Sequence, residues 1–129
     1  MQAKVENRDG IFVVNLSGHM DFESADSLKT NCLKTLGNHE VIFNMKELSF
    51  VGSSGIGPFL ELLSELSKTL GPKFKICSVG TEFMRMFESS SVDGIEIYRD
   101  VQEAHRAFYS PDVQALARLR PFGLKLTIE

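Results

Sequence analysis

The sequence contains no tryptophan, only two cysteines and four prolines, and no long hydrophobic run. Cys32 and Cys77 lie far apart, each within an apolar pattern, so we expect two buried reduced thiols and neither a disulfide nor a metal pair. No stretch approaches the roughly 18 apolar residues that a membrane-spanning helix needs, and the first residues carry no apolar signal region. The chain is therefore expected to be cytoplasmic, without direct insertion into a membrane.

An excess of basic residues is also lacking. Lys and Arg number 14 against 17 Asp and Glu, the formal net charge is −3, and the basic residues form no dense cluster. Binding of nucleic acid would require a basic surface, so no direct contact with nucleic acid is expected. His19, His39 and His105 match no spacing of metal ligands, and the sequence has no recognisable cofactor motif. No metal and no cofactor are predicted.

What is present fits one globular domain of 129 residues, 43% of them hydrophobic and 24% charged. Apolar alternation predicts two strands, at residues 3–6 and 11–16, joined by an Asp9-Gly10 turn as an antiparallel hairpin. The same kind of pattern predicts further strands near residues 41–45, 74–79 and 95–98. Helical spacing predicts one helix that begins at Asp21 or Ser24, and others near residues 59–70, 81–89 and 101–108.

This order of elements (β-β-α-β-α-β-α-β-α) predicts an α/β fold: a single domain over residues 1–109, with helices packed on a mixed, mainly parallel sheet that has one antiparallel edge. Residues 110–129 form a C-terminal extension outside the alternation. Ser110-Pro111-Asp112 is a typical helix start, with Val113, Leu116 and Leu119 on one stripe, and residues 124–128 alternate as a strand does. The extension is expected to dock either on its own domain or on a partner chain, where it would support a homodimer.

The segment richest in chemical signals lies between a buried strand and the most regular helix, and it reads Phe50-Val51-Gly52-Ser53-Ser54-Gly55-Ile56-Gly57. Its glycines let the backbone turn sharply and leave the two serines accessible. One interpretation is that Ser53 or Ser54 is only a helix cap. The other is that one of them is modified, because a phosphoryl group at a helix N-terminus meets free N–H donors and the positive end of the dipole.

A second polar segment follows the strand at residues 11–16 and ends at Asp21. Ligands and partners tend to approach the carboxyl ends of strands in open α/β sheets. A simple cap for the first helix is the alternative role for Asp21.

Two stretches together resemble the double signature of the STAS-domain anti-sigma factor antagonists (anti-anti-sigma factors), namely Leu16-x-Gly18-x-x-Asp21-x-x-x-Ala25-x-x-Leu28 and Asn44-Met45-x-x-Leu48-x-Phe50-Val51-Gly52-Ser53-Ser54-Gly55-Ile56-Gly57. The resemblance extends from about residue 3 to residue 109 and includes the element order. It implies a non-enzymatic bacterial signalling protein that regulates transcription: the domain binds an anti-sigma factor, often a serine kinase, and thereby frees a sigma factor. In the family, the kinase phosphorylates a serine that opens the second helix, and a phosphatase resets it.

The resemblance assigns roles to particular residues. The phosphorylated serine falls on Ser53, with Ser54 as the less favoured site, and the functional aspartate falls on Asp21. We further expect the exposed loop and the first turn of its helix to form the partner surface with Asp21; the predicted partner-binding residues are Asp21, Gly52, Ser53, Ser54, Gly55, Ile56 and Phe59. Two positions depart from the family pattern, because Gly52 and Asn44 stand where the family usually has aspartates. Both departures lower the negative charge near the serine that the kinase must recognise.

Other functions remain open for the same fold. One is an unphosphorylated STAS scaffold, or the small subunit of a membrane lipid-transport ATPase; Gly52 and Asn44 favour this alternative. An enzyme with Ser53 as nucleophile is disfavoured, because no histidine or lysine accompanies that serine as a general base in any recognisable arrangement.

Overall fold

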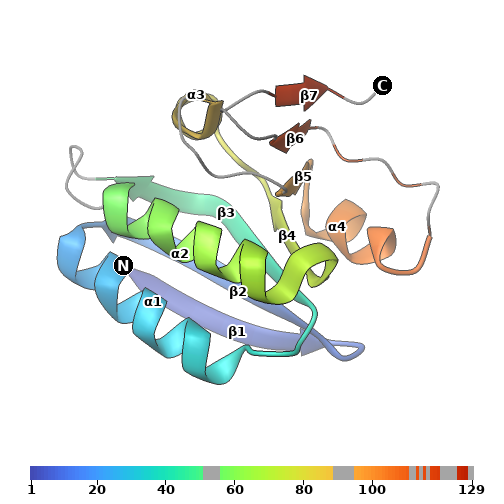
Figure 1. Cartoon of the computed structure of the whole chain (residues 1–129), viewed down its shortest axis with the longest axis horizontal. Coiled ribbons are helices and arrows are strands. Elements are labelled where there is room, and N and C mark those ends of the chain that lie inside the picture. The colour runs from blue at the N-terminus through green and yellow to red at the C-terminus, as the bar shows by residue number, and fades with distance from the viewer. Residues whose placement is uncertain are drawn as a thin grey trace.

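The computed structural model describes residues 1–50, 56–88, 95–110, 113, 115, 117–119 and 125–127. The strands are β1 (Gln2–Arg8), β2 (Ile11–Met20), β3 (Val41–Phe50), β4 (Phe74–Cys77), β5 (Glu96–Tyr98), β6 (Ala117–Leu119) and β7 (Lys125–Thr127). The α-helices are α1 (Phe22–Thr35), α2 (Ile56–Leu70), α3 (Thr81–Glu88) and α4 (Val101–Ala107), and a 3₁₀ turn, Gly71–Lys73, follows α2. Up to α4 the order of strands and α-helices is the one that the sequence predicts (Figure 1).

All the described strands form one mixed sheet in the order β1-β2-β3-β4-β5-β6-β7. The pairs from β2 to β5 are parallel, whereas β1 pairs antiparallel with β2. The hairpin turn has positive φ at both central residues, Asp9 (56°) and Gly10 (86°), as the twist of a two-residue hairpin requires. The predicted α/β fold is therefore confirmed, with a parallel centre from β2 to β5 and the expected antiparallel edge at β1; β6 and β7 add a second antiparallel edge beside β5.

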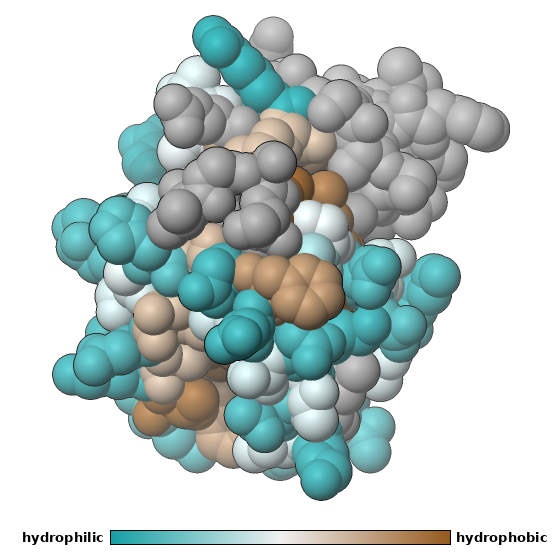
Figure 2. Space-filling model, turned by 90° about the vertical axis from the view of Figure 1, so that its left-hand side faces the viewer, coloured by the Kyte–Doolittle hydropathy of each residue, from teal (hydrophilic) through white to brown (hydrophobic). Residues whose placement is uncertain are grey.

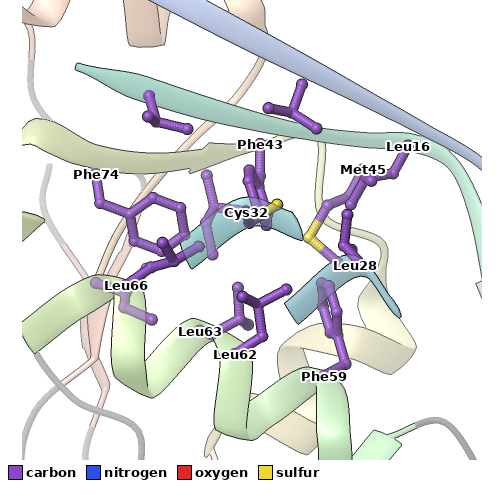
Figure 3. Close-up of a cluster of buried hydrophobic side chains, with 14 of the residues drawn as sticks. Leu16, Leu28, Cys32, Phe43, Met45, Phe59, Leu62, Leu63, Leu66 and Phe74 are labelled. Atoms are coloured by element: carbon purple, nitrogen blue, oxygen red, sulfur yellow. The ribbon is translucent and has the colours of Figure 1, made fainter. Parts of the chain in front are cut away.

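The sheet separates two apolar cores. The larger core joins one face of the sheet to α1, α2 and α3, and the smaller core lies between the other face and α4. Figure 3 shows how side chains of α2 point at the sheet and fill the larger core; the labelled ones are Phe59, Leu62, Leu63 and Leu66. Helical spacing in the sequence thus produces one continuous apolar stripe on α2.

The two cysteines are buried, as predicted, and form no disulfide. Burial raises the pKa of Cys32 to about 11 and that of Cys77 to about 12, because a thiolate is poorly solvated in these apolar surroundings. Both thiols are therefore unreactive at neutral pH.

Two predictions about the elements need correction. The central strand extends to Phe50 and not only to residue 45, because its second half pairs with the end of β2. The C-terminal extension was predicted to begin with a helix, but residues 117–119 form β6, which pairs antiparallel with β5, and β7 pairs with β6. Pairing satisfies the backbone groups at the edge of β5, and this tertiary gain overrides the local helix signal.

Candidate functional site

Both α1 and α2 begin at the same end of the sheet (Figure 1). Because β2 and β3 are parallel and Met20 is the register partner of Phe50, the chain leaves both strands at the same level. Asp21 follows one strand, and residues 51–55 follow the other before α2 starts at Ile56. We call this region the switch end of the sheet. The register places Asp21 and the end of β3 at Phe50 at this common end.

Asp21 is held in place by the first turn of α1. Its Oδ1 accepts a hydrogen bond from the Ser24 backbone N–H at 2.9 Å, and the Ser24 hydroxyl accepts one from the Asp21 N–H at 3.0 Å. These two bonds form a capping box, so the capping role expected for Asp21 is present. The bond from the Ser24 N–H, and then the bond from its hydroxyl, lower the pKa of Asp21, which lies fully exposed. Asp21 is therefore an ionised carboxylate at neutral pH.

The cap makes a testable contribution to acid stability. Because the pKa of Asp21 is lower in the folded state, its stabilising effect is complete above the unfolded pKa of about 4 and is lost as the pH falls through the folded pKa. Asp21→Ser keeps a cap that does not titrate, so its melting temperature should fall less than that of the wild type between pH 5 and pH 2.5. Circular dichroism melts measure this difference, expected to be a few degrees. If the melting temperatures of the two proteins fell equally with pH, the assignment of Asp21 as a titrating helix cap would be contradicted.

The ends of β2 and β3 are tied together just before the switch end. Gly18 has φ of 85°, and a Cβ there would lie 3.3 Å from the Met1 Cα, so glycine suits both the backbone conformation and the close approach. The Ser49 hydroxyl lies 2.7 Å from His19 Nδ1 and donates to the Gly18 carbonyl at 3.3 Å. β2 and β3 both continue past the end of β4, and these contacts hold their last residues in register.

Asn44 lies inside β3, and not at its end as the sequence reading placed it. Its Nδ2 donates to Asn15 Oδ1 at 2.8 Å, and its Oδ1 accepts from the Lys46 N–H at 3.2 Å. The register of β2 and β3 shifts by one residue directly after this pair, which identifies a β-bulge. Asn44 therefore stabilises the irregular part of the strand that carries the chain to the switch end.

The other predicted partner-binding residues have different outcomes. Gly52, Ser53, Ser54 and Gly55 lie outside the described residues. Ile56 is half-buried at the start of α2. Phe59, in contrast, is 0% exposed and belongs to the larger core, so its predicted direct contact with a partner does not agree with the structure. A helix stripe that begins at residue 59 points inward, since α2 packs its apolar face on the sheet.

Phe22 is the surface residue that the sequence reading missed. It is the first residue of α1, directly after Asp21, and its side chain is 59% exposed. The sequence carries no clear signal for this exposure, because Phe22 lies only three residues before Ala25, the first buried residue of the inward stripe of α1. Figure 2 views the molecule from the side on which α1 and α2 begin and shows apolar side chains there among hydrophilic ones. Exposed aromatic side chains are enriched at protein contact sites.

A pocket of about 790 Å³ adjoins the switch end. Its apolar lining includes the core side chains Met45, Leu48 and Phe83, and its polar lining includes the exposed Lys46 and Arg85.

Within the residues that can be described, no group of three His, Cys, Asp or Glu side chains is arranged to hold a metal ion. None of the described helices is both long and apolar enough to cross a membrane. The pocket and the exposed Asp21 and Phe22 support binding of another molecule at this end of the sheet.

Comparison with known proteins places the chain in one family. The model of the STAS domain family matches residues 2–104. The chain therefore belongs to the STAS domain family, as the resemblance in the sequence implied. Among curated proteins it is similar to the anti-sigma F factor antagonist of Paenibacillus polymyxa, with 23% identity over 95 residues that cover 71% of this chain and 80% of the relative.

Two solved structures share the fold. An anti-sigma factor antagonist from Mycobacterium paratuberculosis superposes with a TM-score of 0.65 and 22% identity, covering 84% of this chain and 94% of that one. The Bacillus cell fate determinant SpoIIAA, in its phosphorylated form, superposes with a TM-score of 0.60 and 20% identity, covering 82% of this chain and 99% of that one. At these identities the likeness concerns the fold.

Proposed function

We propose that the chain is an anti-sigma factor antagonist that acts in the cytoplasm as a protein-binding switch. In the unmodified state its switch end binds an anti-sigma factor that is also a serine kinase. Phosphorylation of Ser53 by that kinase releases the partner, and a phosphatase restores binding. The observation that carries the proposal is the register of Met20 with Phe50, because it brings Asp21 and the chain that leads to Ser53 to one end of the sheet.

Several features of the switch end support protein binding. Asp21 supplies an ionised carboxylate, and Phe22 supplies a large apolar side chain that is 59% exposed. Large aromatic side chains that become buried on binding are common anchors of protein interfaces. The relative from Paenibacillus polymyxa is named for antagonism of an anti-sigma factor. The phosphorylated form of SpoIIAA is a precedent for phosphorylation in a protein of this fold.

The position of Ser53 in the sequence supports its role as the modified residue. In the sequence it lies three residues before Ile56, where α2 begins, and we expect a phosphate on it to meet the N–H groups of the first turn and the positive end of the helix dipole. The first turn of α2 carries no acidic side chain that would repel such a phosphate. A dianion added at this place would change the charge that the partner meets.

The proposal is tested by recovering the chain from its native cell together with its partners. We expect a small ATP-binding protein to co-purify, to phosphorylate Ser53 when ATP is added, and to release a sigma factor when the unmodified chain is in excess. Mass spectrometry maps the phosphate, and native gels follow release of the sigma factor. Recovery of a membrane-transport ATPase in place of such a kinase would reject the proposal in favour of the transport alternative.

A substitution at Phe22 tests the contact surface separately from the modification. Phe22→Ala is expected to lower the affinity for the anti-sigma factor about 10- to 100-fold, because the aromatic anchor is lost. The free energy of unfolding should change by less than about 1 kcal/mol, since the side chain is largely exposed. Isothermal titration calorimetry and urea unfolding measure the two quantities.

Tyr109 provides the matched control for this substitution. It is 61% exposed, but its hydroxyl donates to the Asp9 carbonyl at 3.1 Å, so it lies at the hairpin turn, the opposite end of the sheet from Asp21. Tyr109→Ala should leave the affinity unchanged. Equal losses in the two variants would show that Phe22 has no special place in the interface.

A further inference from the structure

The strand β1 is an open edge of the sheet. It pairs with β2 along its whole length, and among the residues that the structure describes no strand pairs with its other side. Every residue of β1 from Gln2 to Arg8 is exposed, including the apolar Val5, which is 56% exposed. A long exposed edge presents a row of backbone donors and acceptors that another strand can use.

The outward-facing backbone groups of β1 follow from its hairpin. A two-residue turn is closed by a hydrogen-bonded pair, here Arg8 with Ile11, and such pairs alternate along an antiparallel ladder. The backbone groups of even-numbered residues of β1 therefore face β2. Those of Ala3, Val5 and Asn7 face away from the sheet and are available to a further strand.

The side chains of β1 alternate as well. Lys4, Glu6 and Arg8 lie on one face, with charges in the order plus, minus, plus. On the other face, Ala3 and Val5 line a small apolar groove of about 190 Å³ beneath α1, together with Val14, Leu28 and Cys32. Lys4 and Glu6, which flank Val5 at equal distance along the strand, therefore carry opposite charges.

We propose that β1 is a homodimer interface, in which two copies of the chain pair their β1 strands antiparallel about a two-fold axis through Val5. In this register all seven residues of β1 are paired, and Ala3, Val5 and Asn7 use their outward backbone groups. Lys4 then stands opposite Glu6 of the partner subunit, and Glu6 opposite the partner's Lys4. These are non-hydrogen-bonded pairs, whose side chains approach most closely. The occupant that fits the edge is therefore a second copy.

The neighbouring registers with the same backbone parity are disfavoured by charge. A shift that centres the axis on Lys4 sets the two Lys4 side chains against each other, and one that centres it on Glu6 does the same for the two Glu6 carboxylates and also opposes Lys4 to Arg8. Charged residues often protect an edge from pairing. Here they repel in the shifted registers and attract in the fully overlapped one, so they select a register instead of preventing association.

The charged face offers room for this pairing. The Lys4 side chain has no recorded partner within the described part of the chain. Glu6 Oε1 lies 3.4 Å from Arg8 Nη2 and accepts from Asn15 Nδ2 at 3.1 Å, with about half of the Glu6 side chain exposed. Its second oxygen is available to Lys4 of the partner subunit. On the opposite face, Val5 and Val5 of the partner subunit would cover apolar surface beside the two grooves.

The dimer leaves both switch ends accessible. In an antiparallel β1 pair the two sheets are related by a two-fold axis, so their switch ends point in opposite directions. Each copy would therefore bind its own partner protein. The interface is also distinct from the C-terminal extension, because β6 and β7 lie at the other edge of the sheet.

Charge exchange in the full-length protein tests the proposal. Lys4→Glu and Glu6→Lys each place like charges in both symmetric pairs and should raise the dissociation constant of the dimer about tenfold or more, as measured by analytical ultracentrifugation. An equimolar mixture of the two variants pairs Glu with Lys at both positions and should form a heterodimer. The double variant Lys4→Glu/Glu6→Lys should dimerise as the wild type does.

Circular dichroism checks that the variants are folded. Lys4→Glu removes no intramolecular contact of the described residues, so its spectrum should match that of the wild type. A wild-type chain that stays monomeric at about 0.5 mM would overturn the proposal. So would a dimer whose dissociation constant is unaffected by the single variants, as expected if the C-terminal extension were the interface, or folded single variants that fail to associate when mixed.

Discussion

Ser53→Asp is expected to bind the anti-sigma factor about thirty- to several-thousand-fold more weakly than the wild type. The new carboxylate would stand at the end of the sheet where Asp21 is already an ionised group, and it would have to be desolvated in the interface without a partner charge. Burying an unpaired charge in a contact zone costs about 2–5 kcal/mol, which corresponds to this range of affinity. Phosphate, with about −1.5 to −2 charges, should have at least as large an effect.

Ser53→Ala separates the charge from the serine itself. It should bind with the affinity of the unmodified wild type and should no longer incorporate phosphate from the kinase. Thr69→Asp adds the same charge near the other end of α2, about 20 Å from Ile56 along the helix, and should bind normally. Titration calorimetry with the purified anti-sigma factor measures all three variants. Unchanged binding of Ser53→Asp would show that charge at this position does not control the switch.

The fold of the first 109 residues was largely predictable because each element carries a local signal. The Asp9-Gly10 turn, the apolar stripe on α2 and the continuous apolar run of β3 each specify one element. Strands that are consecutive in the sequence are also neighbours in the sheet. Asp21 was predictable both as a cap and as a surface group, since a capping carboxylate at a strand end faces solvent.

What could not be predicted depends on contacts between distant segments. Residues 46–50 contain Lys46, Glu47 and Ser49 and carry no strand signal, yet they form a strand because the end of β2 offers backbone partners. The extension behaves similarly, since β6 completes the edge of β5 against its local helix pattern. The exposure of Phe22 depends on how α1 is rotated on the sheet, which a single aromatic residue at a helix start does not reveal.

The burial of Phe59 leads to the second large expected effect. Phe59→Ala should lower the free energy of unfolding by about 3–5 kcal/mol, because it removes a ring from a fully buried site and leaves a cavity. The ring packs beside Phe83, with centroids 6.4 Å apart, and Figure 3 shows it among the side chains between α2 and the sheet. Urea unfolding at neutral pH measures the loss.

The same variant separates a core role from the contact role that the sequence analysis predicted for Phe59. Once the fraction of folded protein is taken into account, Phe59→Ala should bind the anti-sigma factor within a few-fold of the wild type, whereas Phe22→Ala should remain stable and bind weakly. Phe59→Leu, which keeps most of the apolar volume, should recover much of the lost stability. Normal stability of Phe59→Ala combined with a large loss of affinity would place this side chain in the interface and would contradict the packing of α2 described above, since a ring cannot fill the core and contact a partner at once.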